Sequence, residues 1–192
     1  MVDKSELLSM VHTSPHLIYS TPSNTILTLL PGDGVYPWDA SDPKDVEAAE
    51  RKLEFSISWF ADPIYHGKYP DSMRAQLGDR LPTFTDDEVA LVKGSNDFYG
   101  MNHYTANYIR HKKTEPEEDD FAGNLELLFE NKQGDNIGPE TQSVWLRPNP
   151  QGFHDLILWL SKRYGFPTSK SPVFSLFHPL LSPLTYSLPF HN

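Results

Sequence analysis

The chain has 192 residues, of which 38% are hydrophobic and 12% aromatic, as expected of one ordinary folded domain. Its formal net charge of −10 argues against a nucleic-acid partner. Cysteine is absent and the eight histidines show no metal-ligand spacing, so neither a metal nor another cofactor is expected. No apolar run approaches the roughly 20 residues that span a bilayer, and the start carries Asp3 and Glu6 instead of a basic leader. We therefore expect no membrane partner and a cytoplasmic location.

Charge divides the chain into three parts. All but two of the 26 acidic residues, and all but two of the 16 Lys and Arg residues, lie in residues 32–167. The head, residues 1–31, and the tail, residues 168–192, are nearly uncharged and rich in Ser, Pro, Leu, Thr and Phe. Repeated prolines in the tail oppose a helix or a central strand, so both flanks are predicted to be irregular.

The composition of the tail has two interpretations. It can be a disordered extension, although such segments are usually charged and poor in Phe and Leu. Alternatively, because Phe, Leu, Ser and Pro share pyrimidine-rich codons, it can be a translated stretch of an unspliced intron. The sequence leaves open whether the chain is a stable expressed protein or a product of gene modelling or splicing.

A long helix is predicted from about Pro43 to Tyr65. Asp42 suits its N-cap, and Pro43 suits the first helical position, where a missing N–H costs nothing. Apolar residues three or four apart form one stripe, which predicts packing against another layer. The stripe consists of Val46, Ala49, Leu53, Ile57, Phe60 and Ile64.

A second helix and a buried strand are predicted next. Thr85 and Glu88 have the spacing of a capping box at the start of a helix over residues 86–92, and Gly94 is placed to end it in a left-handed conformation. A short aromatic segment follows at residues 97–105, and its polar residues come last. It is typical of a buried strand whose carboxyl end carries functional groups.

The remaining elements are a loop and a last helix. Residues 110–144 are polar and acidic and predict a long loop, with a short helical turn over Leu125 to Phe129. The last helix is predicted from Asn149 and Pro150 to Gly165, with basic residues in its final turn. The order of predicted helices and strands is typical of an α/β protein.

Six segments carry a resemblance to a known family. Residues 32–39 (GDGVYPWD), 59–65 (WFADPIY), 67–70 (GKYP), 81–85 (LPTFT), 102–105 (NHYT) and 159–165 (WLSKRYG) occur in this order. In combination they resemble the fungal type of glycoside hydrolase family 1 β-glucosidases, across residues 32–167. The resemblance implies part of a TIM (β/α)8 barrel, about two βα units around the sixth strand, with the active site at the carboxyl ends of the strands.

The family implies an activity that this chain cannot complete alone. Such enzymes hydrolyse terminal β-glucosides with retention, using two glutamates, one in an Asn-Glu-Pro motif after the fourth strand and one in Thr-Glu-Asn-Gly after the seventh. Neither motif occurs here, and residues 168–192 contain no Asp or Glu. The nearest imitations, around Glu115 and Glu130, lack the flanking residues. No catalytic residue is therefore assigned.

Some secondary site residues of the family are present. By resemblance, Asn102 and Tyr104 contact the substrate or orient the nucleophile at the end of the sixth strand, and Trp145 resembles the platform for the aglycone. A β-glucoside is the implied ligand. His103 and Trp38 are expected to serve packing.

Three functional hypotheses follow from the resemblance. The first is a fragment of a β-glucosidase without activity of its own. The second is a pseudoenzyme that binds sugar or another protein, and the third is a hydrolase completed by a second chain. Unpaired strand edges and uncovered helix faces in an open piece of barrel favour the first. Oligomeric state and natural aglycone stay open.

Overall fold

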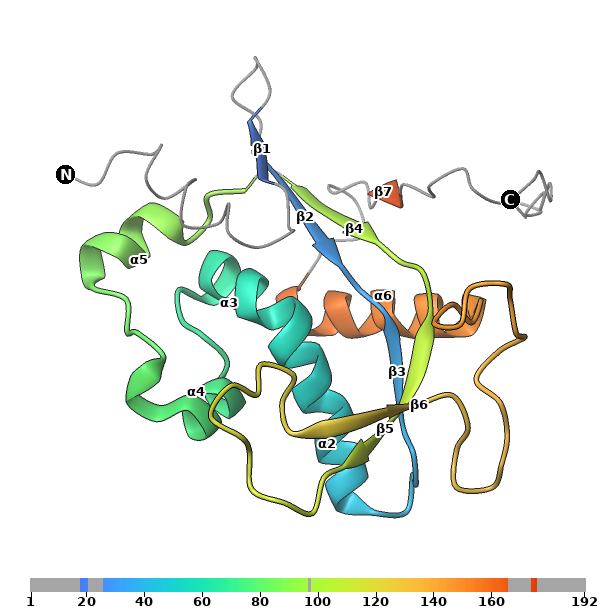
Figure 1. Cartoon of the computed structure of the whole chain (residues 1–192). Coiled ribbons are helices and arrows are strands. Elements are labelled where there is room, and N and C mark those ends of the chain that lie inside the picture. Colours follow the sequence, from blue (N-terminus) through green and yellow to red (C-terminus); the bar gives the residue numbers. More distant parts are fainter. Residues whose placement is uncertain (1–17, 21–25, 97, 166–173, 176–192) are drawn as a thin grey trace.

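The computed structural model describes residues 18–20, 26–96, 98–165 and 174–175, which form two sheets and several helices (Figure 1). The larger sheet has the strand order β1-β2-β4-β7. Parallel pairing places Leu27 of β2 opposite Phe98 of β4, and β7 also runs parallel to β4, whereas β1 joins β2 antiparallel. The bounds are β1 Ile18–Ser20, β2 Ile26–Pro31, β4 Phe98–Asn102 and β7 Phe174–Ser175.

Both flanks contribute strands, so the prediction that residues 1–31 and 168–192 are irregular is wrong for part of them. β1 and β2 lie in the head, and β7 lies in the tail. Backbone N–H and C=O groups of a segment can be satisfied by a strand far away in sequence, as β4 does for β2 and β7. The remaining flank residues lie outside the described ones.

The smaller sheet has the order β3-β5-β6. Its strands are β3 Gly34–Pro37, β5 Ala106–His111 and β6 Leu125–Leu128, of which β3 and β5 are parallel and β5 and β6 antiparallel. The helical turn predicted over Leu125 to Phe129 is therefore wrong. A segment of four residues is too short for its hydrophobic pattern to distinguish a helical turn from a strand. Its pairing with β5 makes it a strand.

The long helix is confirmed, with an irregularity at its centre. It consists of α2 (Pro43–Leu53), the π-helical turn η1 (Glu54–Ser58) and α3 (Trp59–His66). The Asp42 carboxylate accepts the Lys44 N–H at 2.9 Å, and Gly67 ends the helix with a φ of 78°. Most of the predicted stripe is buried. Val46 is an exception, because it lies at the rim of a groove between α2, β3 and α6 and is 47% exposed.

Three shorter elements follow the long helix. They are α4 (Asp71–Leu77), the 3₁₀ turn η2 (Gly78–Arg80) and α5 (Asp86–Val92). The capping box of α5 forms as predicted, since Glu88 N–H donates to Thr85 Oγ1 and Thr85 N–H donates to Glu88 Oε2. Gly94 takes the expected left-handed conformation with a φ of 74°.

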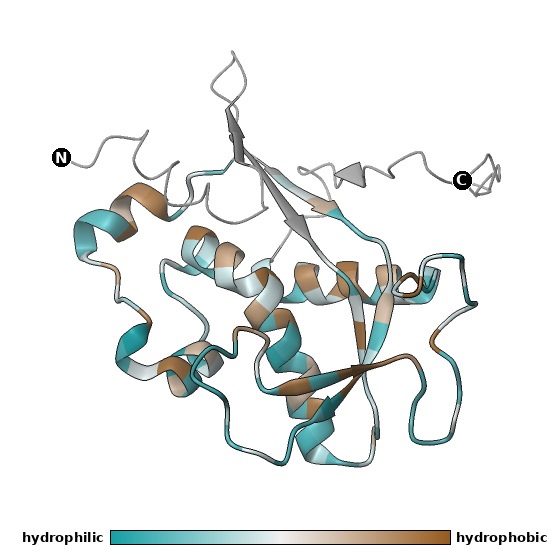
Figure 2. Ribbon diagram, viewed as in Figure 1, coloured by the Kyte–Doolittle hydropathy of each residue, from teal (hydrophilic) through white to brown (hydrophobic). Residues whose placement is uncertain are grey.

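The last predicted helix is confirmed as α6 (Pro150–Tyr164), and it closes the main core. Figure 1 shows α6 lying across β3, against which it packs. The core joins the long helix, β4 and α6 through Leu53, Ile57, Ala61, Tyr99, Met101, Leu156 and Leu160. In Figure 2 apolar and polar residues alternate around both helices, as amphipathic helices on a sheet require. None of the described helices combines the length and the apolar composition needed to cross a membrane.

Candidate functional site

The carboxyl ends of β2 and β4 meet at one edge of the larger sheet, which we call the strand-end edge. Gly32 N–H donates to the Asn102 carbonyl at 2.8 Å, and Gly34 N–H donates to the Thr105 carbonyl at 3.0 Å. At Gly34 a Cβ atom would lie 2.8 Å from the Cα of Gly152 in α6, so only glycine fits there. The chain leaving β2 is thus held between β4 and α6.

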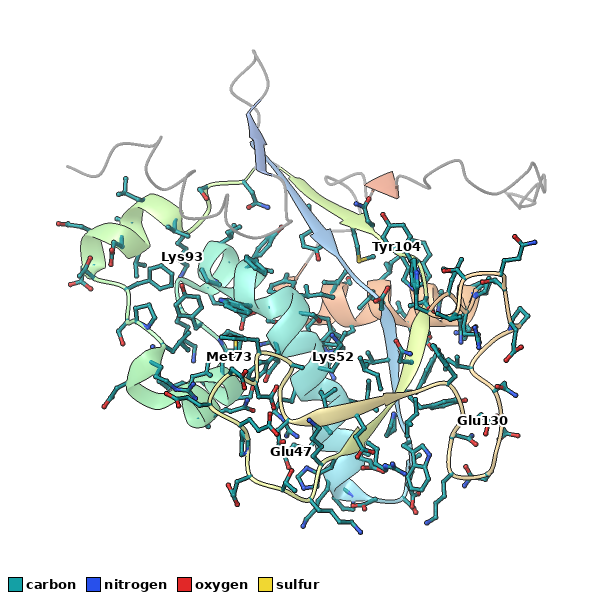
Figure 3. All side chains as sticks on the ribbon, in the orientation of Figure 1. Glu47, Lys52, Met73, Lys93, Tyr104 and Glu130 are labelled. Carbon is teal, nitrogen blue, oxygen red and sulfur yellow. The ribbon has the colours of Figure 1, made fainter. Side chains whose placement is uncertain are left out.

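Tyr104 and Trp145 come together at this edge, although 41 positions separate them in the sequence. Their ring centroids are 6.1 Å apart at an interplanar angle of 79°, an edge-to-face contact. Tyr104 is 39% exposed, Trp145 is 54% exposed and the neighbouring Val144 is 81% exposed. Figure 3 shows Tyr104 beyond the end of β4. The two predicted aromatic residues form one accessible surface, whereas Asn102 is half-buried.

Thr105 holds the loop that carries Trp145. Its hydroxyl donates to the Arg147 carbonyl at 3.2 Å and accepts the Arg147 N–H at 3.0 Å. The Arg147 guanidinium in turn lies 4.4 Å from the Phe129 ring centroid and pairs with Glu140 at 3.2 Å. Trp145 is therefore positioned two residues from a buried anchor.

His103 points away from this surface and packs in the interior. It is 9% exposed, its ring lies 4.9 Å from that of Phe153, and its Nε2 atom has no hydrogen-bond partner among the described residues. Burial lowers the pKa of His103 to about 4. The imidazole is neutral near pH 7, and its position agrees with the expected packing role.

Two opposite charges near the same edge, on the half-buried residues Asp33 and Lys52, were not predicted from the sequence. Burial raises the pKa of Asp33, while Lys52 of α2 and the backbone N–H groups of Thr105 and Tyr104 oppose that rise. Burial likewise lowers the pKa of Lys52, and the Asp33 carboxylate opposes it. Asp33 therefore links the end of β2 to the segment after β4, and its charge and that of Lys52 on the long helix influence each other. Its place between two glycines after an apolar run was the available signal.

The two glutamates that imitate the family motifs lie elsewhere. Glu115 and Glu130 are both exposed, and Glu130 sits in a bridge with Asn136. Figure 3 shows Glu130 well away from Tyr104. Among the described residues, no cluster of three or more His, Cys, Asp or Glu side chains could hold a metal ion.

Parallel strands joined through helices, with polar residues at the strand ends, define an α/β chain that matches part of a TIM barrel. A profile of glycosyl hydrolase family 1 matches residues 9–173, which extends the resemblance of residues 32–167 into both flanks. The chain belongs to glycosyl hydrolase family 1.

Similar proteins include several fungal β-glucosidases. Beta-glucosidase 1B of Phanerodontia chrysosporium is 48% identical over 138 residues, covering 72% of this chain and 25% of that protein. A crystal structure of a GH1 β-glucosidase from Humicola insolens in complex with glucose is 75% identical, with a TM-score of 0.70 over 72% of this chain and 29% of that one. β-Glucosidase 2 of Trichoderma reesei, in complex with Tris, is 65% identical, with a TM-score of 0.72 over 77% of this chain and 31% of that one. The chain thus spans about a quarter to a third of its relatives.

Proposed function

We propose that this chain is a sugar-facing part of a family 1 β-glucosidase that does not hydrolyse β-glucosides alone. In this interpretation β2, β4 and β7 take the places of the fifth, sixth and seventh barrel strands. The observation that carries the proposal is the sequence itself, in which neither Asn-Glu-Pro nor Thr-Glu-Asn-Gly occurs. Retaining hydrolysis needs both carboxylates, about 5–5.5 Å apart, in each of its two steps.

The strand-end edge supports a binding role without catalysis. The exposed pair of Tyr104 and Trp145 offers an apolar wall for a glucoside ring or its aglycone. Asp33 lies at the same edge, but its carboxylate accepts hydrogen bonds from the backbone N–H groups of residues 104 and 105 and is within the electrostatic influence of Lys52. A carboxylate that is already held by backbone hydrogen bonds is a poor nucleophile, so Asp33 does not replace a missing glutamate.

The test compares hydrolysis of a chromogenic aryl β-glucoside by three proteins. The purified chain should show no activity above buffer, because removing either carboxylate costs several orders of magnitude in kcat. A version extended by the upstream half-barrel and by a Thr-Glu-Asn-Gly segment should be active. Activity of the short chain that survives repurification and disappears in Glu130→Gln or Glu115→Gln would overturn the assignment of no catalytic residue.

A second candidate function is favoured by the exposure of Val144 and Trp145. Apolar side chains that are 81% and 54% exposed beside one another are typical of a surface that is covered in use. The cover can be a sugar, as in a pseudoenzyme, or a second chain that completes the site. Protection of the Trp145 indole from fluorescence quenching by a β-glucoside, in the absence of turnover, would support the sugar.

A further inference from the structure

A hollow lies at the end of β3 in the smaller sheet, away from the strand-end edge. It has a volume of about 380 Å³ and is open to solvent. Its walls come from the end of β3, from β5 and from the turn after β6, through Tyr36, Trp38, Asp39, Tyr108, Asn131 and Gln133. The volume falls in the range of small-molecule pockets, about 300–1,000 Å³. Neither Tyr104 nor Trp145 lines it.

Three aromatic rings line this hollow. The Tyr36 and Tyr108 rings are 6.2 Å apart and tilted by 50°, so they present an angled wall instead of a closed stack. The Arg110 guanidinium lies 4.9 Å from the centre of the Trp38 ring, and Arg110 is itself held by Glu126 at 2.6 Å. Trp38, for which only packing was expected, is therefore fixed in place beside an open volume. A preformed aromatic wall binds apolar ring faces with little loss of side-chain entropy.

The polar groups around the rings are electrically balanced. The Asp39 carboxylate pairs with Lys132 and accepts from the Ser41 hydroxyl at 2.6 Å. Asn131 Oδ1 accepts the Gln133 and Asp135 N–H groups at 2.9 and 2.8 Å, which fixes the turn that forms the rim. Because both Arg110 and Lys132 already have carboxylate partners, neither cation is free to attract a phosphate or a carboxylate ligand.

Two hydrogen-bonding groups at the hollow are left over. Among the described residues, the indole N–H of Trp38 and the side-chain amide of Gln133 have no hydrogen-bond partner. An indole N–H donates, and an amide both donates and accepts. A ligand that fits must offer a flat apolar face to the rings and hydroxyl groups to these two side chains.

We propose that this hollow binds an uncharged saccharide, at a site separate from the strand-end edge. The C–H face of a pyranose ring packs on the angled wall of Tyr36, Trp38 and Tyr108. Its hydroxyls pair with the Trp38 indole N–H and the Gln133 amide. The inference goes beyond the proposed function, since it requires neither a barrel nor a catalytic carboxylate.

The experiment follows the indole N–H signals of the full chain by two-dimensional NMR during titration with glucose, cellobiose and cellotriose. The chain has four tryptophans, so Trp38→Phe and Trp145→Ala assign two of the four signals by their loss. The Trp38 signal should shift saturably with at least one of these sugars, and Trp145→Ala should leave its midpoint unchanged. No shift at millimolar sugar, or a shift confined to Trp145, would overturn the proposal.

Gln133→Ala provides the second variant, because its exposed side chain makes no contact on which folding depends. Loss of one hydrogen bond should weaken binding by about 2- to 10-fold. An unchanged midpoint in Gln133→Ala, or tighter binding of glucose 6-phosphate than of glucose, contradicts the assignment to this hollow or to an uncharged ligand. The readout is independent of hydrolysis, so its failure is distinguishable from failure of the proposed function.

Discussion

His103 makes the stability of this chain depend on pH. The perturbation is the replacement of His103 by Phe, which keeps an aromatic ring beside Phe153 and removes the titratable group. Burial alone lowers the pKa of His103 from 6.5 to about 4. The unfolded chain therefore binds more protons than the folded chain between these two pKa values, so the free energy of unfolding falls as the pH falls through this window.

The magnitude follows from the two pKa values. At about pH 5 an unfolded histidine with a pKa of 6.5 is almost fully protonated, whereas a folded one with a pKa of about 4 is about one-tenth protonated. The difference between the two states destabilises the fold by about 2 kcal/mol relative to about pH 7.5. This contribution is complete above the unfolded pKa and is lost as the pH falls toward the folded pKa.

Urea unfolding followed by tryptophan fluorescence at the two pH values measures the effect. Carboxylates also titrate in this range, so the informative quantity is the difference between the natural chain and His103→Phe. The natural chain should lose about 2 kcal/mol more than the variant on acidification. An equal loss in both proteins would refute the reasoning, and so would a His103 titration midpoint near 6.5 in NMR spectra.

The other predictions concern packing, pairing, capping and association. Arg163→Met should lower the free energy of unfolding, measured with urea, by about 3 kcal/mol. The reason is that Asp62, which is 2% exposed and bonded to Arg163 at 2.7 and 3.0 Å, then has a buried carboxylate without its cation. Adding Asp62→Asn to the same chain should recover part of the loss. Ile57→Ala should lower the free energy of unfolding by about 2–5 kcal/mol, since Ile57 is fully buried. A smaller loss would contradict the assignment of Ile57 to the core. Thr85→Ala should lower the free energy of unfolding by about 1 kcal/mol, because the α5 cap is lost. A control substitution on the exposed face of α5 should leave the free energy of unfolding unchanged. The purified chain should associate in sedimentation, and Val144→Ser should reduce this association; a cooperative monomer would show a domain in its own right.

Helices were largely predictable because their signals are local. Asp42 before a proline, the spacing of Thr85 and Glu88, and Gly165 after a basic turn each determine a helix end within a few residues. The strand β4 was also predictable, since a short aromatic run between two loops has few alternatives. Helix α4, which begins after Pro70, has too few turns to show a period, and it was missed.

Strands that depend on distant partners were not predictable. β2 and β7 both pair with β4, across intervals that no local pattern spans. The segment from Leu125 was assigned to a helical turn because its partner, β5, could not be identified before the fold was known. Non-local pairing thus explains each of these errors.

In the candidate site too, local features were predictable from the sequence and contacts between distant segments were not. Asn102 and Tyr104 belong to one contiguous motif, so the sequence placed them together at the end of β4. The contact of Tyr104 with Trp145 joins a strand to a loop and became visible only in the structure. The pairing of Asp33 with Lys52 also crosses elements, and neither residue alone distinguishes itself from a surface charge.

The pairing of Asp33 with Lys52 constrains how this sequence can drift. A change at either position alone removes the opposite charge that partly offsets the desolvation of the other, while simultaneous replacement by two uncharged side chains removes both charges. The two positions are therefore expected to vary together or not at all across descendants of this chain. Single-site mutational scans will report both as intolerant, although the tolerated route passes through the double variant.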